Sequence, residues 1–273
     1  MKSFIEKLEN QNDISNSLLC VGLDADLSKL PQSFVNRANP LFQFNKAIIA
    51  TTHDLVGSYK LNSAFYESLG DRGITQLKMT IDYLRATHPT IPLILDAKRA
   101  DIGNTNDGYI KMIFDYLGVD AVTLHPYLGR EAVDNFLSLA DRGIIILCRT
   151  SNPGAGEFQD LMVEGKPLYM HVAEKVSTTW NGNNNCLLVV GATYPDEMKQ
   201  IRTAVGDMTF LVPGIGAQGG DVEKTVHAGI NSRKKGIIVH SSRGIIYASS
   251  GDDFAERARE EAIKLRNEIN RYR

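Results

Sequence analysis

The chain is poor in the residues that build disulfide frameworks and zinc sites. It has three cysteines in 273 residues, and Cys20, Cys148 and Cys186 lie far apart in apolar runs. An odd number of cysteines without Cys-x-x-Cys spacing disfavours both a disulfide scaffold and a structural zinc site. We therefore expect all three thiols to be small, buried core residues.

The chain also lacks a strong net charge and any long apolar run. Its 30 basic and 32 acidic side chains leave a net charge of −2, which disfavours a nucleic-acid-binding or membrane-surface protein. No apolar run approaches the roughly 18 residues that span a bilayer, and the N-terminal MKSFIEKLEN is too charged for a signal peptide. These absences predict a cytoplasmic protein, in which a local cationic pocket for a small phosphorylated ligand is still possible.

The apolar residues that are present gather in short runs. Several runs, such as IIIL and LLVV, are continuously apolar rather than alternating. Such runs are typical of strands buried on both faces, as in a parallel sheet covered by helices. The eight predicted strands are Leu18–Leu23, Ser58–Leu61, Pro92–Lys98, Ala121–His125, Ile144–Arg149, Cys186–Ala192, Thr209–Pro213 and Ile237–Ser241.

Stretches with helical periodicity lie between the strands. Strict alternation of strand and helix predicts βαβ units, and eight repeats in one chain of this length favour a closed barrel over an open sheet. We therefore predict an α/β fold, a single-domain (β/α)8 TIM barrel over residues 1–273, with its active site at the C-terminal ends of the strands. The predicted helices include Leu41–Val56, Thr75–Thr87, Asn106–Leu117, Arg130–Ala140, Pro195–Val205, Asp221–Ala228 and Asp252–Asn270.

One connection, Asn152–Pro167, is unusually long for a compact domain. It follows the fifth predicted strand, at the end where a barrel builds its active site. Loops of this length usually serve a function or move, but a tolerated insertion fits the sequence equally well.

Charged residues end the second and third predicted strands. Asp96 and Lys98 are two apart on a strand, so their side chains point the same way, and Asp101 follows where the strand has become loop. Such a cluster is costly unless its charges satisfy one another, and Lys60 from the neighbouring strand would complete a Lys–Asp–Lys–Asp set. A solvated salt-bridge cluster is the alternative, but the catalytic rim of a barrel favours a functional role.

Two further motifs follow the seventh and eighth predicted strands. Glycines crowd the loop PGIGAQGG, and SSRG ends the eighth strand. Exposed backbone N–H groups and the bidentate fork of Arg243 both suit an anion. Loops at these two positions commonly hold phosphate in such barrels. Each motif alone is also typical of a tight turn, but together they predict a phosphate site.

These segments together resemble the orotidine 5'-phosphate decarboxylase family. LDAKRADIGNT matches the family's Asp-x-Lys-x-x-Asp signature, YKLNSAFYE its second-strand lysine segment, GLDAD its ribose-binding aspartate, and VPGIGAQGGD with HSSRG its phosphate-binding loops. The matches run in order from about Leu19 to Ser249, and RTSNPGA with the overall length resembles the longer bacterial-type branch. The resemblance implies a homodimeric barrel that converts orotidine 5'-monophosphate to uridine 5'-monophosphate in pyrimidine biosynthesis without a cofactor.

The resemblance also implies roles for single residues. Lys98 would donate a proton to C6 of the base, Lys60 would hydrogen-bond the charged network and the ribose, and Asp96 would lie against the substrate carboxylate. Asp101 would reach into the other subunit's site. Thr150 is an alternative to its neighbour Ser151 at the pyrimidine edge. The substrate-binding residues implied are Asp24, Asn62, Thr105, Ser151, Gly216, Gln218, Arg243 and Gly244.

Three other functions compete with this one. A metal-dependent sugar-phosphate decarboxylase or aldol synthase of the same superfamily shares the Asp-x-Lys-x-x-Asp motif, but such enzymes carry an acid where this chain has Lys60. A Schiff-base aldolase would use Lys98 or Lys60 as a nucleophile. A catalytically silent nucleotide-binding barrel is the non-enzymatic alternative, and the intact set of lysines and aspartates argues against it.

Overall fold

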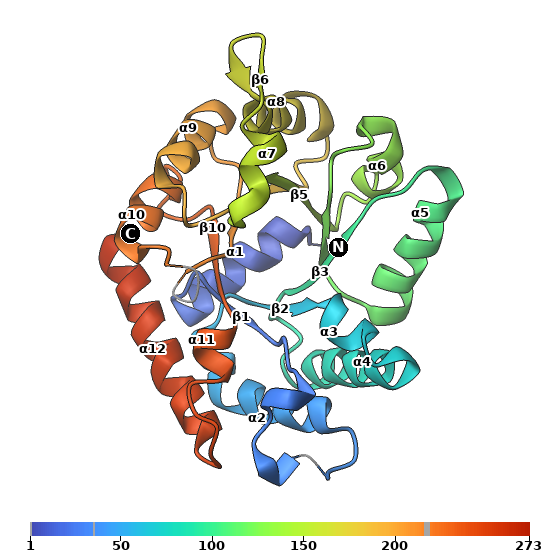
Figure 1. Ribbon diagram of the computed structural model, residues 1–273, viewed down its shortest axis with the longest axis vertical. Helices are drawn as coiled ribbons and strands as arrows, with labels where there is room; N and C mark the ends of the chain where they lie inside the picture. Colours follow the sequence, from blue (N-terminus) through green and yellow to red (C-terminus); the bar gives the residue numbers. More distant parts are fainter. Residues whose placement is uncertain (1, 35, 216–218) are drawn as a thin grey trace.

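The computed structural model describes residues 2–34, 36–215 and 219–273. The barrel strands are β1 Leu19–Gly22, β2 Ser58–Asn62, β3 Leu93–Arg99, β4 Ala121–Leu124, β5 Gly143–Arg149, β8 Cys186–Val190, β9 Phe210–Val212 and β10 Ile237–Ser241. They are parallel and close in the order β1-β10-β9-β8-β5-β4-β3-β2, with helices around them (Figure 1). The eight predicted strands and the (β/α)8 barrel are therefore confirmed.

Helices form the outer layer of the barrel. Seven of them correspond to the predicted helical stretches named above, and the other five are α1, α3, α7, α8 and α11. The bounds are α1 Phe4–Ser15, α2 Pro40–Thr52, α3 Ser63–Glu67, α4 Gly70–Thr87, α5 Gly103–Ile110, α6 Arg130–Leu137, α7 Gly156–Gln159, α8 Leu168–Lys175, α9 Pro195–Val205, α10 Val222–Gly229, α11 Arg243–Ile246 and α12 Phe254–Tyr272. Two of them, α5 and α8, continue into the π-helical segments Lys111–Leu117 and Val176–Trp180.

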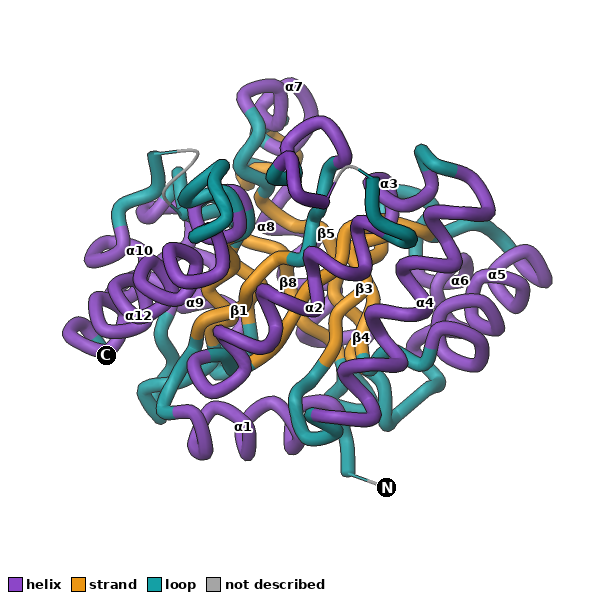
Figure 2. Tube along the Cα trace, turned by 90° about the horizontal axis from the view of Figure 1, so that it is seen from below, coloured by secondary structure: helices purple, strands orange, loops and turns teal. Residues whose placement is uncertain are grey.

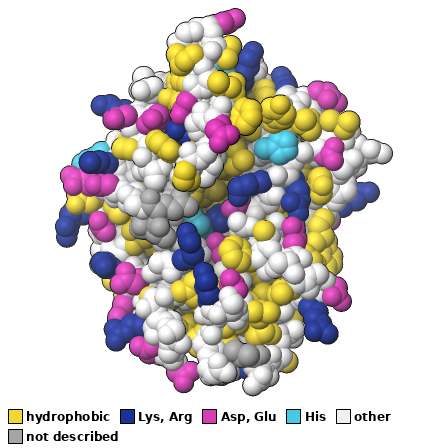
Figure 3. All heavy atoms as spheres, in the orientation of Figure 1, with side chains coloured by type: hydrophobic (Ala, Val, Ile, Leu, Met, Phe, Trp, Pro, Cys, Tyr) yellow, Lys and Arg dark blue, Asp and Glu magenta, His cyan; other side chains and the backbone are white. Residues whose placement is uncertain are grey.

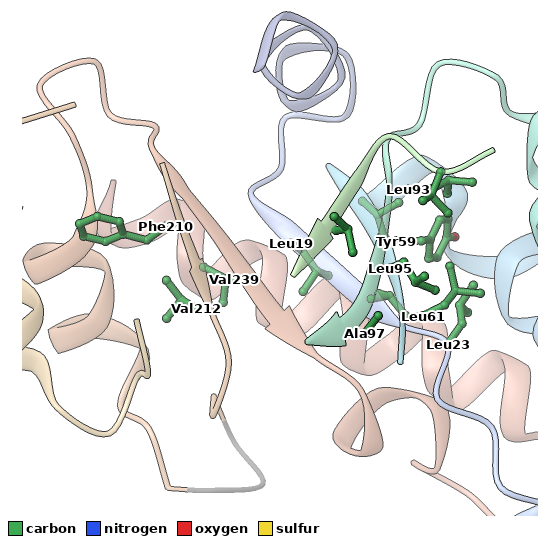
Figure 4. Packing of buried hydrophobic residues seen from close by; sticks show 14 of the residues in the cluster. Leu19, Leu23, Tyr59, Leu61, Leu93, Leu95, Ala97, Phe210, Val212 and Val239 are labelled. Atoms are coloured by element: carbon green, nitrogen blue, oxygen red, sulfur yellow. The ribbon is translucent and has the colours of Figure 1, made fainter. Parts of the chain in front are cut away.

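Alternation along the strands divides the buried apolar residues into two clusters. Side chains that point out of the barrel, such as Leu61 and Leu95, pack beneath the helices (Figure 4). Side chains of the opposite parity, such as Ile94 and Ala121, form a separate cluster inside the barrel. Strands such as β5 and β8 therefore bury both faces, which is why the runs IIIL and LLVV are continuously apolar.

The helix α1 closes the N-terminal end of the barrel (Figure 2). Phe4 and Leu8 from α1 pack against the inner cluster. Gly143, at the start of β5, makes this approach possible, because a Cβ there would lie 2.4 Å from the Phe4 ring. Because α1 covers the N-terminal end of the barrel, the barrel interior is accessible from the C-terminal ends of the strands.

The predicted long loop has structure of its own. It contains α7 and a small antiparallel hairpin, β6 Met162–Val163 and β7 Lys166–Pro167, which projects at the top of Figure 1. The three cysteines are buried and unpaired, as expected. Among the described helices, none has the length and apolar character that crossing a membrane requires.

Candidate active site

A pocket of about 520 Å³ opens at the C-terminal ends of the barrel strands. Basic and acidic side chains gather around the hollow near the middle of this face (Figure 3). Of the residues predicted from the sequence, the pocket is lined by Asp24, Lys60, Asn62, Asp96, Lys98, Ser151 and Arg243. Thr150, the alternative to Ser151, lines it as well.

Strand parity explains why the charged residues meet here. Ile94 points into the barrel, so Asp96, two residues later on β3, also points inward but nearer the open end. Lys60 on β2 and Thr123 on β4 share this inward parity, since their neighbours Leu61 and Val122 pack outward. A polar layer therefore lies directly above the apolar inner cluster.

Two lysines and two aspartates form a continuous charged cluster. The Lys60 ammonium lies 3.1 Å from Asp96 Oδ2 and 3.9 Å from Asp24 Oδ2. The Lys98 ammonium lies 2.7 Å from Asp96 Oδ1, so each oxygen of Asp96 receives one lysine. Within one chain the cluster therefore alternates in sign in the order Asp24, Lys60, Asp96, Lys98.

Burial and mutual attraction both act on the ionisation of this cluster. Burial alone would lower the pKa of Lys60, but the charges of Asp24 and Asp96 outweigh it and raise that pKa above its ordinary value. Burial alone would raise the pKa of Asp96, but Lys60, Lys98 and the hydrogen bonds from Lys98 and Thr123 lower it. Lys60 is therefore an ammonium and Asp96 a carboxylate at neutral pH.

The backbone at Lys98 departs from regular strand geometry. Lys98 has a φ of +46°, in the left-handed region that residues other than glycine rarely adopt. The β3–β4 register shifts between Leu95 and Arg99, so this is a bulge at the site. Bulges near active sites re-aim side chains, and here the bulge coincides with the residue predicted to donate the proton.

Asp24 and Asn62 form the side of the pocket next to β1. Asp24 Oδ1 accepts the backbone N–H of Asn62 at 3.0 Å. The Asn62 side chain donates to Asp96 Oδ2 at 3.4 Å, and its carbonyl oxygen caps α3 by accepting from Ala64 N at 3.1 Å. Asp24 and Asn62, both predicted to bind the substrate, are thus fixed by the same network that holds Asp96.

The two predicted phosphate-binding segments, which follow β9 and β10, meet in the wall of the pocket on the other side of β1 from β2. Ser241, Ser242 and Arg243 line it together with Pro213, Gly214 and Ile215. The loop after β9 closes on itself, with Gly220 N donating to Gly214 O at 3.1 Å. A Cβ on Gly220 would lie 2.7 Å from the Ala192 Cβ, so a larger residue would clash at this position of the loop.

Three predicted substrate-binding residues of these segments remain, and only one of them, Gly244, lies in the described part of the chain. Gly216 and Gln218 lie outside the described residues. Gly244 follows Arg243 in the first turn of α11, but within the described chain it lines a smaller neighbouring cavity instead.

The long loop after β5 contributes a residue that the sequence did not suggest. Gln159 of α7 lines the pocket, donates to Thr150 Oγ1 at 2.8 Å and accepts from Thr150 N at 2.9 Å. Asp160 pairs with the buried Arg149 at 3.2 Å, and the Arg149 guanidinium stacks on Tyr194 at 3.8 Å. These contacts hold α7 beside Thr150 and Ser151, so the loop is part of the pocket wall.

Asp101 and Thr105 lie away from the pocket of their own barrel. In the described part of the chain the pocket lining includes neither residue. Thr105 is exposed, and Asp101 Oδ1 accepts only its neighbour's N–H, that of Ile102 at 2.7 Å, among the described hydrogen bonds. The Asp101 backbone is anchored through Asn106, whose Oδ1 accepts Asp101 N at 2.9 Å.

Comparison with known proteins identifies the family of this chain. A family model described as orotidine 5'-phosphate decarboxylase / HUMPS family matches residues 17–258. The orotidine 5'-phosphate decarboxylase of Cellvibrio japonicus (strain Ueda107) is 52% identical over 270 residues, covering 98% of each chain. That of Janthinobacterium sp. (strain Marseille) is 46% identical over 270 residues, covering 99% of each chain.

A solved structure supports the same assignment. The OMP decarboxylase of Leishmania donovani superposes with a TM-score of 0.83 at 35% identity, covering 97% of this chain and 99% of that one. The family model spans most of the chain, and the relatives match it end to end. The chain therefore belongs to the orotidine 5'-phosphate decarboxylase family.

Proposed function

We infer that this chain is a carboxy-lyase that converts orotidine 5'-monophosphate to uridine 5'-monophosphate, a step of pyrimidine biosynthesis. The observation that carries the inference is the Lys60–Asp96–Lys98 cluster at the mouth of a barrel whose relatives are named for this reaction. The substrate is a phosphorylated pyrimidine nucleotide.

The charged cluster suggests how the reaction proceeds. The bond between C6 and the carboxylate breaks, CO2 leaves, and the electron pair stays on C6 in an orbital that the ring cannot delocalise. A fixed ammonium near C6 stabilises that charge, and preorganised charges of this kind are a large source of catalysis. Lys98, half-exposed at the pocket, fills this role and then transfers a proton from Nζ to C6.

Asp96 and the phosphate group have complementary roles in this proposal. Asp96 lies beside the substrate carboxylate, and the repulsion between them is relieved as CO2 departs. Lys60 holds Asp96 ionised and contacts the ribose with Asp24 and Asn62. Binding of the remote phosphate by Arg243 and the glycine loop supplies energy that orients the reacting end.

We expect full activity without any metal ion. The position between Asp24 and Asp96, where two carboxylates would attract a divalent cation, is filled by the Lys60 ammonium. Purified protein treated with excess EDTA should therefore convert orotidine 5'-monophosphate to uridine 5'-monophosphate at an unchanged rate. The rate is measured from the decrease in absorbance as the substrate is consumed. A requirement for added magnesium would move the assignment to the metal-dependent sugar-phosphate decarboxylases and aldol synthases.

A Schiff-base mechanism fits the cluster poorly. A lysine attacks a carbonyl only as the neutral amine, so Schiff-base lysines need a lowered pKa. The pKa of Lys60 is raised by Asp24 and Asp96 instead. Borohydride with substrate should leave no covalent adduct on Lys60 or Lys98, whereas a trapped adduct detected by mass spectrometry would reverse this conclusion.

Arg243→Ala should weaken binding of the phosphorylated substrate selectively. A hydrogen bond to a charged group contributes roughly 1.5–3 kcal/mol, so kcat/KM for orotidine 5'-monophosphate should fall about 10- to 150-fold. The unphosphorylated nucleoside, orotidine, should lose little. Arg233→Ala is the matched control, because Arg233 pairs with Glu9 of α1 at the opposite end of the barrel. Equal losses for both substrates would remove Arg243 from the phosphate site.

The proposed assembly is a homodimer with shared active sites. Asp101 and Thr105 serve the partner's pocket rather than their own, which agrees with their place outside the lining described above. The same rim exposes large apolar side chains, with Ile102 58%, Tyr127 87% and Leu128 46% accessible. Exposed apolar groups of this kind commonly mark an interface, and a two-fold axis makes the exchange reciprocal.

The proposed organisation is one domain over residues 1–273 in the cytoplasm. α1 packs against the inner cluster of the barrel, and α12 packs against the outer cluster and contacts α2 and α10, so both helices pack on the same barrel. The three unpaired thiols suit a reducing compartment. A single thermal unfolding transition would support the one-domain organisation, and two separate transitions would contradict it. Recovery of the protein in the soluble fraction of lysed cells would support the cytoplasmic location.

A further inference from the structure

The hydroxyl of Thr123 on β4 joins two members of the charged cluster. Thr123 is 1% exposed and lines the pocket. Its Oγ1 accepts the backbone N–H of Lys98 at 3.0 Å and lies 2.9 Å from Asp96 Oδ1. An amide N–H can only donate and an ionised carboxylate can only accept. The hydroxyl proton must therefore point to Asp96, and the hydrogen bonds run in one direction from Lys98 N–H through Thr123 to Asp96.

This contact lies at the bulge in β3. Lys98 has φ of +46°, and the regular β3–β4 pairing is interrupted between Leu95 and Arg99. The amide of Lys98 is thereby displaced from the regular ladder, and the Thr123 hydroxyl accepts its hydrogen bond instead. A residue with a Cβ keeps a left-handed backbone conformation only where its surroundings stabilise it. The hydrogen bond from Lys98 N to Thr123 Oγ1 is one such stabilising contact.

One oxygen of Asp96 accepts hydrogen bonds from both Lys98 and Thr123. Asp96 Oδ1 accepts from the Lys98 ammonium at 2.7 Å and from the Thr123 hydroxyl at 2.9 Å. The backbone and the ammonium of Lys98 are thus both fixed relative to one oxygen atom, the first through Thr123 and the second directly. Loss of the hydroxyl would leave the ammonium contact but free the backbone that carries it.

We propose that Thr123 is a positioning residue for the decarboxylation, which sets the Lys98 backbone and the Asp96 carboxylate relative to each other so that the ammonium faces C6. The proposal rests on the function inferred above. Thr123 touches neither the reacting carbon nor its leaving group in this account, and it acts through Lys98 and Asp96. A buried hydroxyl in the otherwise apolar segment AVTL is explained by this role.

Thr123→Val tests the proposal, because valine keeps the shape and removes both hydrogen bonds. We expect kcat to fall about 10- to 100-fold, since displacement of a reacting group by about 1 Å can cost 10²-fold. The affinity for uridine 5'-monophosphate should stay within about 3-fold, because product binding does not need the proton donor. Thr123→Ser restores the hydroxyl and should recover kcat to within a few-fold of the parent.

Thr52→Val is the matched control for loss of a buried threonine hydroxyl. Thr52 is fully buried on α2, where its Oγ1 contacts Ile48 O at 2.7 Å and Tyr59 Oη at 2.8 Å. Its replacement should lower Tm and leave kcat unchanged. Amide hydrogen exchange of Lys98, measured by NMR, should accelerate in Thr123→Val and not in Thr52→Val.

Several results would overturn the proposal. A Thr123→Val protein with kcat within 2-fold of the parent would do so, and so would a folded Thr123→Ser protein as slow as the valine variant. If the valine variant does not fold, Thr123→Ala is compared with Thr123→Ser on the same criteria. Absence of turnover in the unmodified chain would overturn the proposed function itself, which separates the two failures.

Discussion

Lys98→Ala is expected to lower kcat for orotidine 5'-monophosphate by about 10⁴-fold or more. The estimate combines loss of a proton donor, typically worth 10²- to 10⁴-fold, with loss of a fixed charge beside the developing carbanion, typically worth about 10²- to 10³-fold. Binding of uridine 5'-monophosphate should change little, because the product has no carboxylate and no charge at C6. Single-turnover measurements of product formation and isothermal titration with the product would give the two quantities separately.

The fold should survive this replacement. The Lys98 side chain is 50% exposed, so its removal leaves no buried cavity. Asp96 keeps its ion pair with Lys60 at 3.1 Å and its hydrogen bond from Thr123. Lys224→Ala, at an exposed position on α10, is the control and should match the parent in kcat and Tm. Turnover of Lys98→Ala within a few-fold of the parent would make Lys98 a structural member of the ion cluster.

The fold was predictable because a doubly buried strand has a simple pattern. Runs such as IIIL in β5 and LLVV in β8 have no polar face, and a parallel barrel covered by helices is the arrangement that needs none. The alternation of side-chain direction along a strand then extended the prediction from the fold to the active site. Once Ile94 points inward, Asp96 must as well, and the end of a barrel strand is where the pocket forms.

The bulge at Lys98 could not be predicted from the sequence. Its left-handed backbone depends on a hydroxyl from another strand, and the single threonine in AVTL looks like an ordinary β-branched strand residue. Gln159 was missed for a similar reason. Its contact with Thr150 requires α7 to fold back over the strand end, and nothing in GEFQ specifies that direction.

α1, in contrast, left a signal that could have been used. Ser3 and Glu6 form a capping box, in which Ser3 Oγ accepts from Glu6 N at 3.2 Å and Glu6 accepts from Ser3 N at 2.7 Å. Phe4 and Leu8 then lie one turn apart on the face that enters the barrel. The position of α1 beneath the barrel is a tertiary property, but its existence was readable from these four residues.

Mixing two inactive variants should restore activity if Asp101 serves the partner's site. Lys98→Ala and Asp101→Ala, each nearly inactive alone, are combined and allowed to exchange subunits. In a mixed dimer one site then carries both defects, and the other has an intact Lys98 with an intact Asp101 from the partner. Random exchange makes about half the dimers mixed, so roughly a quarter of parental activity should return. Steady-state turnover after exchange, with mixed dimers counted by a mass label, gives this fraction.

Asp96→Ala provides the decisive control, since Asp96 and Lys98 lie 2.7 Å apart in one barrel. Mixing Asp96→Ala with Lys98→Ala leaves one defect in every site of a mixed dimer, so no activity should return although exchange proceeds equally. Asp101 differs because it lies beyond β3, on a loop anchored through Asn106 and outside the pocket lining of the described chain. If mixed dimers form but Asp101→Ala also restores nothing, Asp101 acts within its own subunit, and the loop must then move toward its own pocket when substrate binds.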